Sequence, residues 1–231
     1  MWTTVAIPTL GESALLGPLI SDLVDQGGYD SLIVMDNRPS REEHITPVLD
    51  RGAHEARLIE MHCPEMSFHQ MWNWAWRQCC DQDDIGNLIL LNDDIRIPSG
   101  FVTRLVAALR SADDVWCVYP NYTRALVDDA PGDSTLTPTT GTFRRGGLWG
   151  CAFAVRAELL DNPLRPIDDQ FVIWCGDDDL VKQIELAGKK VCRANGLALE
   201  HEMSTTMSKR PQLYEIGWRD IERFKAKYGE W

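Results

Sequence analysis

Leu88-Ile89-Leu90-Leu91-Asn92-Asp93-Asp94-Ile95, residues 88–95, is the stretch that decides the fold class. Four consecutive apolar residues predict a buried strand, and an amide and two carboxylates follow directly where that strand ends. In open α/β sheets, ligands bind beyond the carboxyl ends of the strands. The group of oxygen ligands therefore predicts either a site for a hard divalent cation and phosphate oxygens, or an ordinary Asx turn.

On both sides of this strand, short apolar runs alternate with segments of helical period, which is typical of an α/β domain with a mainly parallel sheet. Before it we expect strands at 3–8, 32–35 and 57–61, and helices at 13–26 and 67–80, the second capped by Ser67. After it we expect a helix to about residue 112, a strand at 115–119, an apolar segment at 148–155, a short helix near Ala157, a helix at 178–187, a strand at 190–194 and a C-terminal helix at 212–227. Residues 121–147 are polar, rich in Pro, Gly and Thr, and without periodicity, so we expect a long loop acting as a lid.

Length and composition predict one soluble domain over residues 1–231, because 44% of the 231 residues are hydrophobic and 25% are charged. This composition excludes disordered and collagen-like chains. No run approaches the ~18 apolar residues of a membrane helix, and no signal-peptide pattern precedes the first strand. We therefore expect a cytoplasmic protein without a membrane span. The net charge of −12 disfavours nucleic acid as a partner, although a modified nucleic-acid base stays among the possible ligands.

The seven cysteines are odd in number and form no Cys-x-x-Cys pair. This usage predicts buried thiols in a reducing compartment, and the spacing does not match a zinc site.

Three further groups could carry chemistry. Asp177, Asp178 and Asp179 begin a predicted helix, where acidic residues favour the helix dipole, but three in a row exceed what a cap needs and one could act as a general base. His201 lies at a predicted strand end, where a lone histidine is more often structural than a ligand. Trp149 with Gly150 could stack on a sugar ring or simply pack within a loop.

In this order, the segments resemble the inverting nucleotide-sugar transferases of glycosyltransferase family 2, which have the A-type glycosyltransferase fold. Thr4 to Thr9 looks like the opening strand and its Pro-Thr turn, and Asn92-Asp93-Asp94 looks like the Asp-x-Asp motif in an Asn-x-Asp form. Residues 171–191 look like the Glu-Asp-x-Asp-Leu helix and the turn after it, and 224–229 like the usual ending. The likeness runs over nearly the whole chain.

The resemblance implies a Rossmann-like domain with a donor half at 1–119 and an acceptor half at 120–231, the latter including the lid loop 121–147 and the C-terminal helix. It implies a metal-dependent inverting glycosyltransferase that moves a hexose or pentose from a nucleoside diphosphate sugar to an acceptor hydroxyl. Mn²⁺ or Mg²⁺ would be held by Asp94 and His201, and the base would be Asp177 or, with the frame moved by one, Asp178; we prefer Asp177. The remaining assignments are donor contacts at Pro8, Thr9, Asp36, Asn73, Asn92 and Asp93, and acceptor contacts at Trp149 and Gly150.

Two other functions use the same residues. A metal-dependent phosphohydrolase acting on nucleotide sugars would employ the same carboxylates without an acceptor. A nucleotide-sugar-binding protein that has lost transfer would keep the fold, because a fold does not fix a function.

Overall fold

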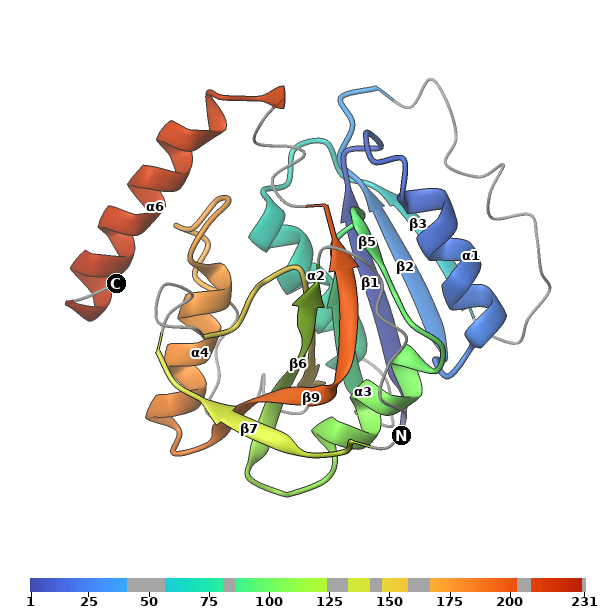
Figure 1. Cartoon of the computed structure of the whole chain (residues 1–231). Coiled ribbons are helices and arrows are strands. Elements are labelled where there is room, and N and C mark those ends of the chain that lie inside the picture. Colours follow the sequence, from blue (N-terminus) through green and yellow to red (C-terminus); the bar gives the residue numbers. More distant parts are fainter. Residues whose placement is uncertain are drawn as a thin grey trace.

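The computed structural model describes residues 1–40, 57–80, 86–123, 133–141, 147–157, 167–202 and 209–229. At its centre lies one nine-stranded sheet with the order β3-β2-β1-β4-β8-β6-β9-β5, in which β7 also pairs with β9 (Figure 1). The strands are β1 (Thr3–Thr9), β2 (Ser31–Asp36), β3 (Arg57–His62), β4 (Asn87–Leu91), β5 (Ile95–Arg96), β6 (Val115–Thr123), β7 (Leu136–Thr139), β8 (Ala152–Arg156) and β9 (Lys190–His201).

Most strands of the sheet point the same way. β3, β2, β1 and β4 are mutually parallel neighbours, and β6 is parallel to β9. β8 lies between β4 and β6 and runs antiparallel to both, while β5 and β7 run antiparallel to β9. The predicted α/β architecture with a mainly parallel sheet is confirmed.

In the described part of the chain, five helices cover the two faces of the sheet (Figure 1). α1 (Leu16–Gln26) and α3 (Phe101–Leu109) pack on one face of the sheet, where they form an apolar core with side chains of β1, β2 and β4. α2 (Phe68–Cys80), α4 (Gly176–Leu186) and α6 (Leu213–Tyr228) contribute to a second apolar core on the other face. The sheet is thus covered on both sides, which explains why β1, β2 and β4 are buried at every position.

Local sequence explains where two of these helices begin. Ser67 caps α2 in a capping box, since its Oγ accepts the Gln70 N–H at 3.3 Å and Gln70 Oε1 accepts the Ser67 N–H at 2.8 Å. α1 begins at Leu16 rather than at the expected Ser13. Pro18, which has no N–H to donate, is tolerated in the first helical turn, where that group would have no partner.

Three segments differ from the expectation. The strand predicted at 190–194 continues to His201, and the two-residue β5 pairs with its end. Part of the stretch expected to be an irregular loop belongs to the sheet, as the end of β6 and as β7, because both pair with β9. Residues 124–132 and 142–146 of the predicted lid, and 158–166 of the predicted short helix, lie outside the described residues.

Among the described residues, no helix is both long and apolar enough to cross a membrane.

Candidate active site

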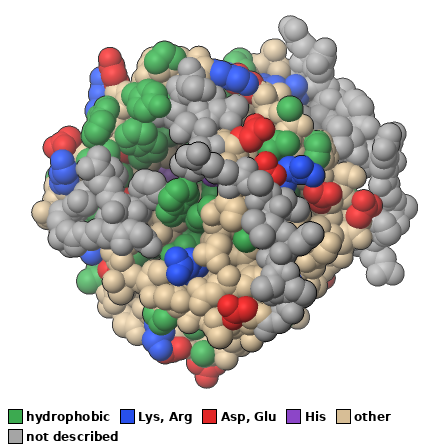
Figure 2. Space-filling model, in the orientation of Figure 1, with side chains coloured by type: hydrophobic (Ala, Val, Ile, Leu, Met, Phe, Trp, Pro, Cys, Tyr) green, Lys and Arg blue, Asp and Glu red, His purple; other side chains and the backbone are tan. Residues whose placement is uncertain are grey.

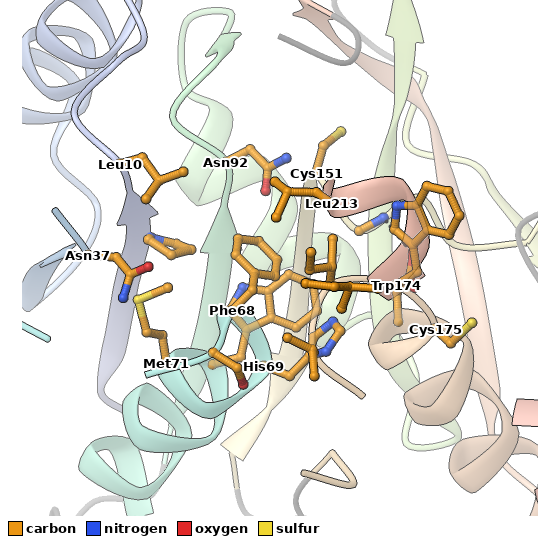
Figure 3. A pocket seen from close by; sticks show the side chains of 18 of the residues that line it. Leu10, Asn37, Phe68, His69, Met71, Asn92, Cys151, Trp174, Cys175 and Leu213 are labelled. Carbon is orange, nitrogen blue, oxygen red and sulfur yellow. Dashed lines mark hydrogen bonds between the residues drawn. The ribbon is translucent and has the colours of Figure 1, made fainter. Parts of the chain in front are cut away.

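A cavity of about 740 Å³ lies beyond the carboxyl ends of β1 and β4 (Figure 3). One wall comes from the residues that follow these strands and from α2, and the other from the segment before β8, the start of α4 and the inner side of α6. Predicted site residues from both halves of the sequence line it: Pro8, Thr9, Asn92, Asp93, Asp94, Trp149, Gly150, Asp177, Asp178 and His201.

Asp94 and His201 meet in this cavity although they lie far apart in the sequence. The antiparallel pairing of β5 with β9 sets Ile95 opposite His201, and the backbone N–H of Glu202 donates to the carbonyl of Asp94 at 3.0 Å. As a result, His201 Nε2 lies 3.2 Å from Asp94 Oδ1, and both side chains are nearly buried, with exposed fractions of 12% and 11%. The structure therefore brings the two predicted metal ligands together.

Asp93 points toward the loop that follows β1. Its Oδ2 accepts a hydrogen bond of 2.5 Å from the Thr9 hydroxyl, and the same hydroxyl oxygen accepts the backbone N–H of Gly11 at 2.8 Å. Burial raises the pKa of Asp93 to about 6; the Thr9 hydrogen bond opposes this shift, and the charge of Asp94 adds to it. Thr9 and Asp93 thus join the loop after β1 to the acidic turn after β4.

Several buried polar atoms of the cavity-lining residues have no hydrogen-bond partner within the described part of the chain. They are His69 Nδ1, Trp72 Nε1, Asn92 Oδ1, Asp94 Oδ1 and His201 Nδ1. Buried polar groups in folded proteins are nearly always hydrogen-bonded or coordinated. The concentration of such atoms along one cavity indicates a wall built to receive a polar ligand.

A divalent cation fits the residues around Asp94. Oδ1 of this carboxylate and Oδ1 of Asn92 have no hydrogen-bond partner within the described residues, and His201 Nε2 lies 3.2 Å from Asp94 Oδ1. No group of three or more His, Cys, Asp or Glu side chains suited to a metal occurs among the described residues. Mg²⁺ is commonly bound in this way, through one or two carboxylates and the phosphates of a substrate.

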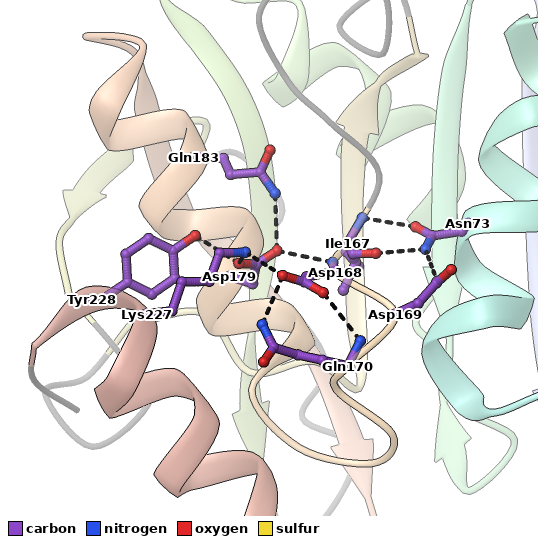
Figure 4. A network of polar contacts seen from close by, with 9 residues as sticks. All are labelled: Asn73, Ile167, Asp168, Asp169, Gln170, Asp179, Gln183, Lys227 and Tyr228. Carbon is purple, nitrogen blue, oxygen red and sulfur yellow. Dashed lines mark hydrogen bonds and ion pairs between the residues drawn. The ribbon is translucent and has the colours of Figure 1, made fainter.

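The three acidic residues at the start of α4 do not all face the cavity. Asp177 and Asp178 line the cavity, whereas Asp179 faces away from it and accepts hydrogen bonds from Lys227 Nζ at 2.7 Å and Tyr228 Oη at 2.6 Å (Figure 4). Successive helix residues are rotated by about 100°, so three neighbours cannot share one direction. Asp179 ties α4 to the C-terminal end of α6.

Asp177 is the acid of this helix whose environment most favours the neutral form. Its Oδ2 accepts the backbone N–H of Gly150 at 3.0 Å, and its Oδ1 accepts that of Asp178 at 3.0 Å. Burial, and next the adjacent charge of Asp178, raise the pKa of Asp177 to about 8, because together they outweigh the hydrogen bonds from backbone N–H groups that lower it. Tyr122 and Cys151 are further titratable groups that interact electrostatically with this carboxyl.

The segment before α4 is held in place from α6. The fully buried carboxylate of Asp220 accepts the backbone N–H groups of Val172, Ile173 and Trp174 at 3.1, 2.8 and 3.0 Å. Cys175, the next residue, is the non-glycine residue with positive φ among the described residues, at 66°. Such a conformation persists only where its surroundings enforce it.

Two predicted donor contacts, Asp36 and Asn73, do not line the cavity. Asp36 is fully buried and binds the Arg38 guanidinium through both oxygens at 2.8 Å, and although burial acts to raise its pKa, the hydrogen bonds and charge of Arg38 lower it. Asn73 accepts the Ile167 N–H at 2.8 Å and donates to the Ile167 carbonyl at 2.7 Å (Figure 4). These hydrogen bonds position the neighbouring loops, and the predicted contacts of both residues with a donor stay predictions.

The two predicted acceptor residues precede β8, on the same wall of the cavity as the acids of α4. Trp149 stacks on Tyr122 with 4.9 Å between ring centroids, and Tyr122 Oη donates to the Trp149 carbonyl at 2.8 Å. At Gly150, an added Cβ would lie 2.9 Å from Asp177 Oδ2 and 3.2 Å from the Trp72 ring. A side chain at this position would therefore disturb the acid.

The structure adds residues to the site that sequence reasoning did not select. His69 lines the cavity from α2 while almost fully buried, and burial lowers its pKa to about 4, so its ring is neutral near pH 7. Trp174 and Trp218 line the wall of the cavity that includes α6. Figure 2 shows hydrophobic side chains gathered at the surface over α6. The helical spacing of His69 and Trp72 in α2 was the available signal, whereas the contribution of α6 depends on tertiary packing.

Comparisons with known proteins find likeness in structure and none in sequence. No protein-family model matches the chain, and no curated protein is significantly similar to it in sequence. GalNAc-T7, solved with UDP, GalNAc and Mn²⁺, superposes with a TM-score of 0.65 and 16% identity over 87% of this chain and 43% of its own. S. aureus TarS 1-349 gives a TM-score of 0.62 and 13% identity over 94% of this chain and 63% of its own.

The chain has the A-type glycosyltransferase fold. Both neighbours are glycosyltransferases of this type, so the predicted family-2-like fold is confirmed. The chain spans less than two thirds of the length of either neighbour. At these identities the likeness establishes the fold alone.

Proposed function

We propose that this protein is a metal-dependent inverting glycosyltransferase, which transfers a hexose or pentose from a nucleoside diphosphate sugar to an acceptor hydroxyl. The observation that carries the proposal is the meeting, in one cavity of an A-type fold, of the Asp94–His201 pair with the acids at the start of α4. A neighbour of the same fold was solved with UDP and Mn²⁺, which supports a nucleotide-sugar donor.

On the donor side, Pro8, Thr9, Asn92 and Asp93 line the wall where the nucleotide and its diphosphate would lie. Asp94 and His201 would hold Mg²⁺ or Mn²⁺, which when bound offsets the charge that develops on the leaving diphosphate. The Thr9–Asp93 hydrogen bond fixes the position of the wall before a donor arrives. A site organised in advance loses less free energy on binding.

On the acceptor side, Asp177 would take the proton from the acceptor hydroxyl as that oxygen attacks the anomeric carbon. A pKa of about 8 makes its carboxylate a stronger base than an ordinary aspartate, and the Gly150 N–H orients it. Attack from the face opposite the diphosphate inverts the configuration and needs no enzyme nucleophile. Asp178, buried beside it, raises this basicity by its charge.

The proposal is tested by calorimetric titration of the purified protein with UDP, GDP and dTDP, with and without Mn²⁺. We expect one nucleotide to bind, and Mn²⁺ to strengthen its binding at least about tenfold. Asp94→Asn should abolish the Mn²⁺ effect, while Asp113→Asn, an exposed acid outside the cavity, should retain it. Equal nucleotide affinity with and without Mn²⁺ in the wild-type protein would refute the metal role.

Product analysis separates transfer from the alternatives. A phosphohydrolase would break down the nucleotide sugar without any acceptor, and at a rate that added acceptors do not change. A binding protein without activity would bind the donor and leave it intact. For the transferase, we expect donor consumption to rise on addition of the acceptor.

The cysteines support a cytoplasmic location as part of this proposal. Six cysteines among the described residues are buried free thiols. Proteins of reducing compartments keep their thiols in this form.

A further inference from the structure

Arg210 is the one Lys or Arg among the described residues that lines the cavity. Four carboxylates, those of Asp93, Asp94, Asp177 and Asp178, line the same cavity. A diphosphate entering this space adds further negative charge, so the site needs positive charge from the protein as well as from a cation. Arg210 is the described side chain that can supply it.

The present partner of Arg210 belongs to another part of the chain, the loop after β1. The Arg210 guanidinium forms an ion pair with Glu12 of that loop. The neighbouring Lys209 Nζ donates to the Glu12 carbonyl at 3.4 Å. The residues just before α6 are therefore linked to the donor-side loop through both the main chain and the side chain of Glu12.

The ion pair lies near the acidic turn after β4. The N–H of Gly11, the residue before Glu12, donates to the Thr9 hydroxyl at 2.8 Å, and that hydroxyl donates to Asp93 Oδ2 at 2.5 Å. Asp93 is adjacent in sequence to Asp94, the proposed cation ligand. A diphosphate held at Asp94 would thus lie within the neighbourhood of the Arg210–Glu12 pair.

We propose that Arg210 binds the diphosphate of the donor, and that Glu12 holds its guanidinium at the cavity wall until the donor displaces it. This inference rests on the proposed function and deepens it. The guanidinium and carboxylate side chains are 33% and 34% exposed, and ion pairs this accessible are weak enough to exchange. A guanidinium presents paired N–H donors that match two phosphate oxygens, so the diphosphate is the stronger partner.

The test compares substitutions of the two residues of one ion pair, which we expect to change nucleotide affinity in opposite directions. Binding of UDP, GDP and dTDP with Mn²⁺ is measured by calorimetry for the wild type, Arg210→Gln and Glu12→Gln. Arg210→Gln should weaken binding of the preferred nucleotide about tenfold or more, because it removes charge-assisted hydrogen bonds. Glu12→Gln should tighten binding about two- to fivefold, because the competing carboxylate is gone.

Glu215→Gln and Arg219→Gln provide the matched control. These residues form an exposed ion pair on α6, 3.8 Å apart and away from the cavity, and both variants should bind as the wild type does. If Glu12→Gln and Arg210→Gln weaken binding alike, or if Arg210→Gln leaves it unchanged, the pair is structural and the inference is wrong. Should Arg210→Gln fail to fold, Glu12→Gln decides alone, with tighter binding in support and equal or weaker binding against.

The two proposals fail in different ways. A wild-type protein that binds none of the three nucleotides overturns the proposed function and this inference with it. A wild-type protein that binds one of them, with Glu12→Gln no tighter, overturns only the role of Arg210.

Discussion

The carboxylate of Asp220 holds together the segment that leads into α4, and its removal should destabilise the protein strongly. Its Oδ2 accepts three consecutive backbone N–H groups at 2.8 to 3.1 Å, and its Oδ1 accepts Arg223 Nη1 at 3.0 Å. The side chain is fully buried. Asp220→Ala would leave the three N–H groups of residues 172–174 without this acceptor.

The size of the effect follows from these contacts. A hydrogen bond to a charged group contributes about 1.5–3 kcal/mol, but three donors that share one oxygen are not additive, and the segment is only half-buried. We therefore expect Asp220→Ala to lower the free energy of unfolding by about 3 kcal/mol. For a domain of this size, this corresponds to a fall in Tm of roughly 6–12 °C.

Urea unfolding followed by tryptophan fluorescence measures this difference directly. Glu222→Ala is the matched control on the same helix, since its side chain is 72% exposed and pairs with Lys225 at the surface; its effect should stay below about 0.5 kcal/mol. Asp220→Asn keeps one acceptor oxygen and should fall between the two. A loss of less than about 1 kcal/mol in Asp220→Ala would refute the anchoring role.

Two predictions concern the acid of α4. The transfer rate should rise about tenfold per pH unit up to pH 8 and then level off, because burial raises the pKa of Asp177 to about 8 and only the deprotonated carboxylate accepts a proton. Gly150→Ala should reduce kcat about tenfold or more while changing nucleotide affinity less than about twofold, because the added Cβ would lie 2.9 Å from Asp177 Oδ2, on the acceptor side of the cavity.

Each of these predictions has a clear contrary result. For the pH profile, a rate that is constant between pH 6 and pH 8 would show that Asp177 is not the base, and Asp178→Asn would then be the next variant to measure. For Gly150→Ala, loss of nucleotide binding in parallel with kcat would mean that the substitution disturbs the whole cavity. Matched thermal unfolding curves for wild type and variant distinguish local from global damage.

The first part of the fold, from β1 to β4, was predictable because its signals are local. Each of β1, β2 and β4 contains a short apolar run, and polar residues follow where each run ends. Parallel strands bring those ends to one edge of the sheet, so the proximity of Thr9 and Asp93 follows from the pattern of strands alone. The predicted cap at Ser67 is confirmed for the same reason, since a capping box involves only four residues.

Features that depend on long-range pairing escaped prediction. β5 has only two residues, too few to show any periodicity, yet its pairing with β9 is what sets His201 beside Asp94. The resemblance to a known family implied that His201 and Asp94 hold one metal ion, whereas the residues alone left the role of His201 open. Asp36 and Asn73 do not line the cavity, and they hold neighbouring loops through Arg38 and Ile167; their predicted donor contacts stay predictions.

β8 runs antiparallel to β4, and the two walls of the cavity come from separate segments of the chain. Because β8 runs against β4, the residues that enter it, Gly150 and Cys151, reach the same rim as the residues that leave β4. Residues 147–149 can therefore differ between proteins without shifting β1, β2 or β4. Under the proposed function, such differences would change the acceptor and leave the nucleotide-binding residues in place.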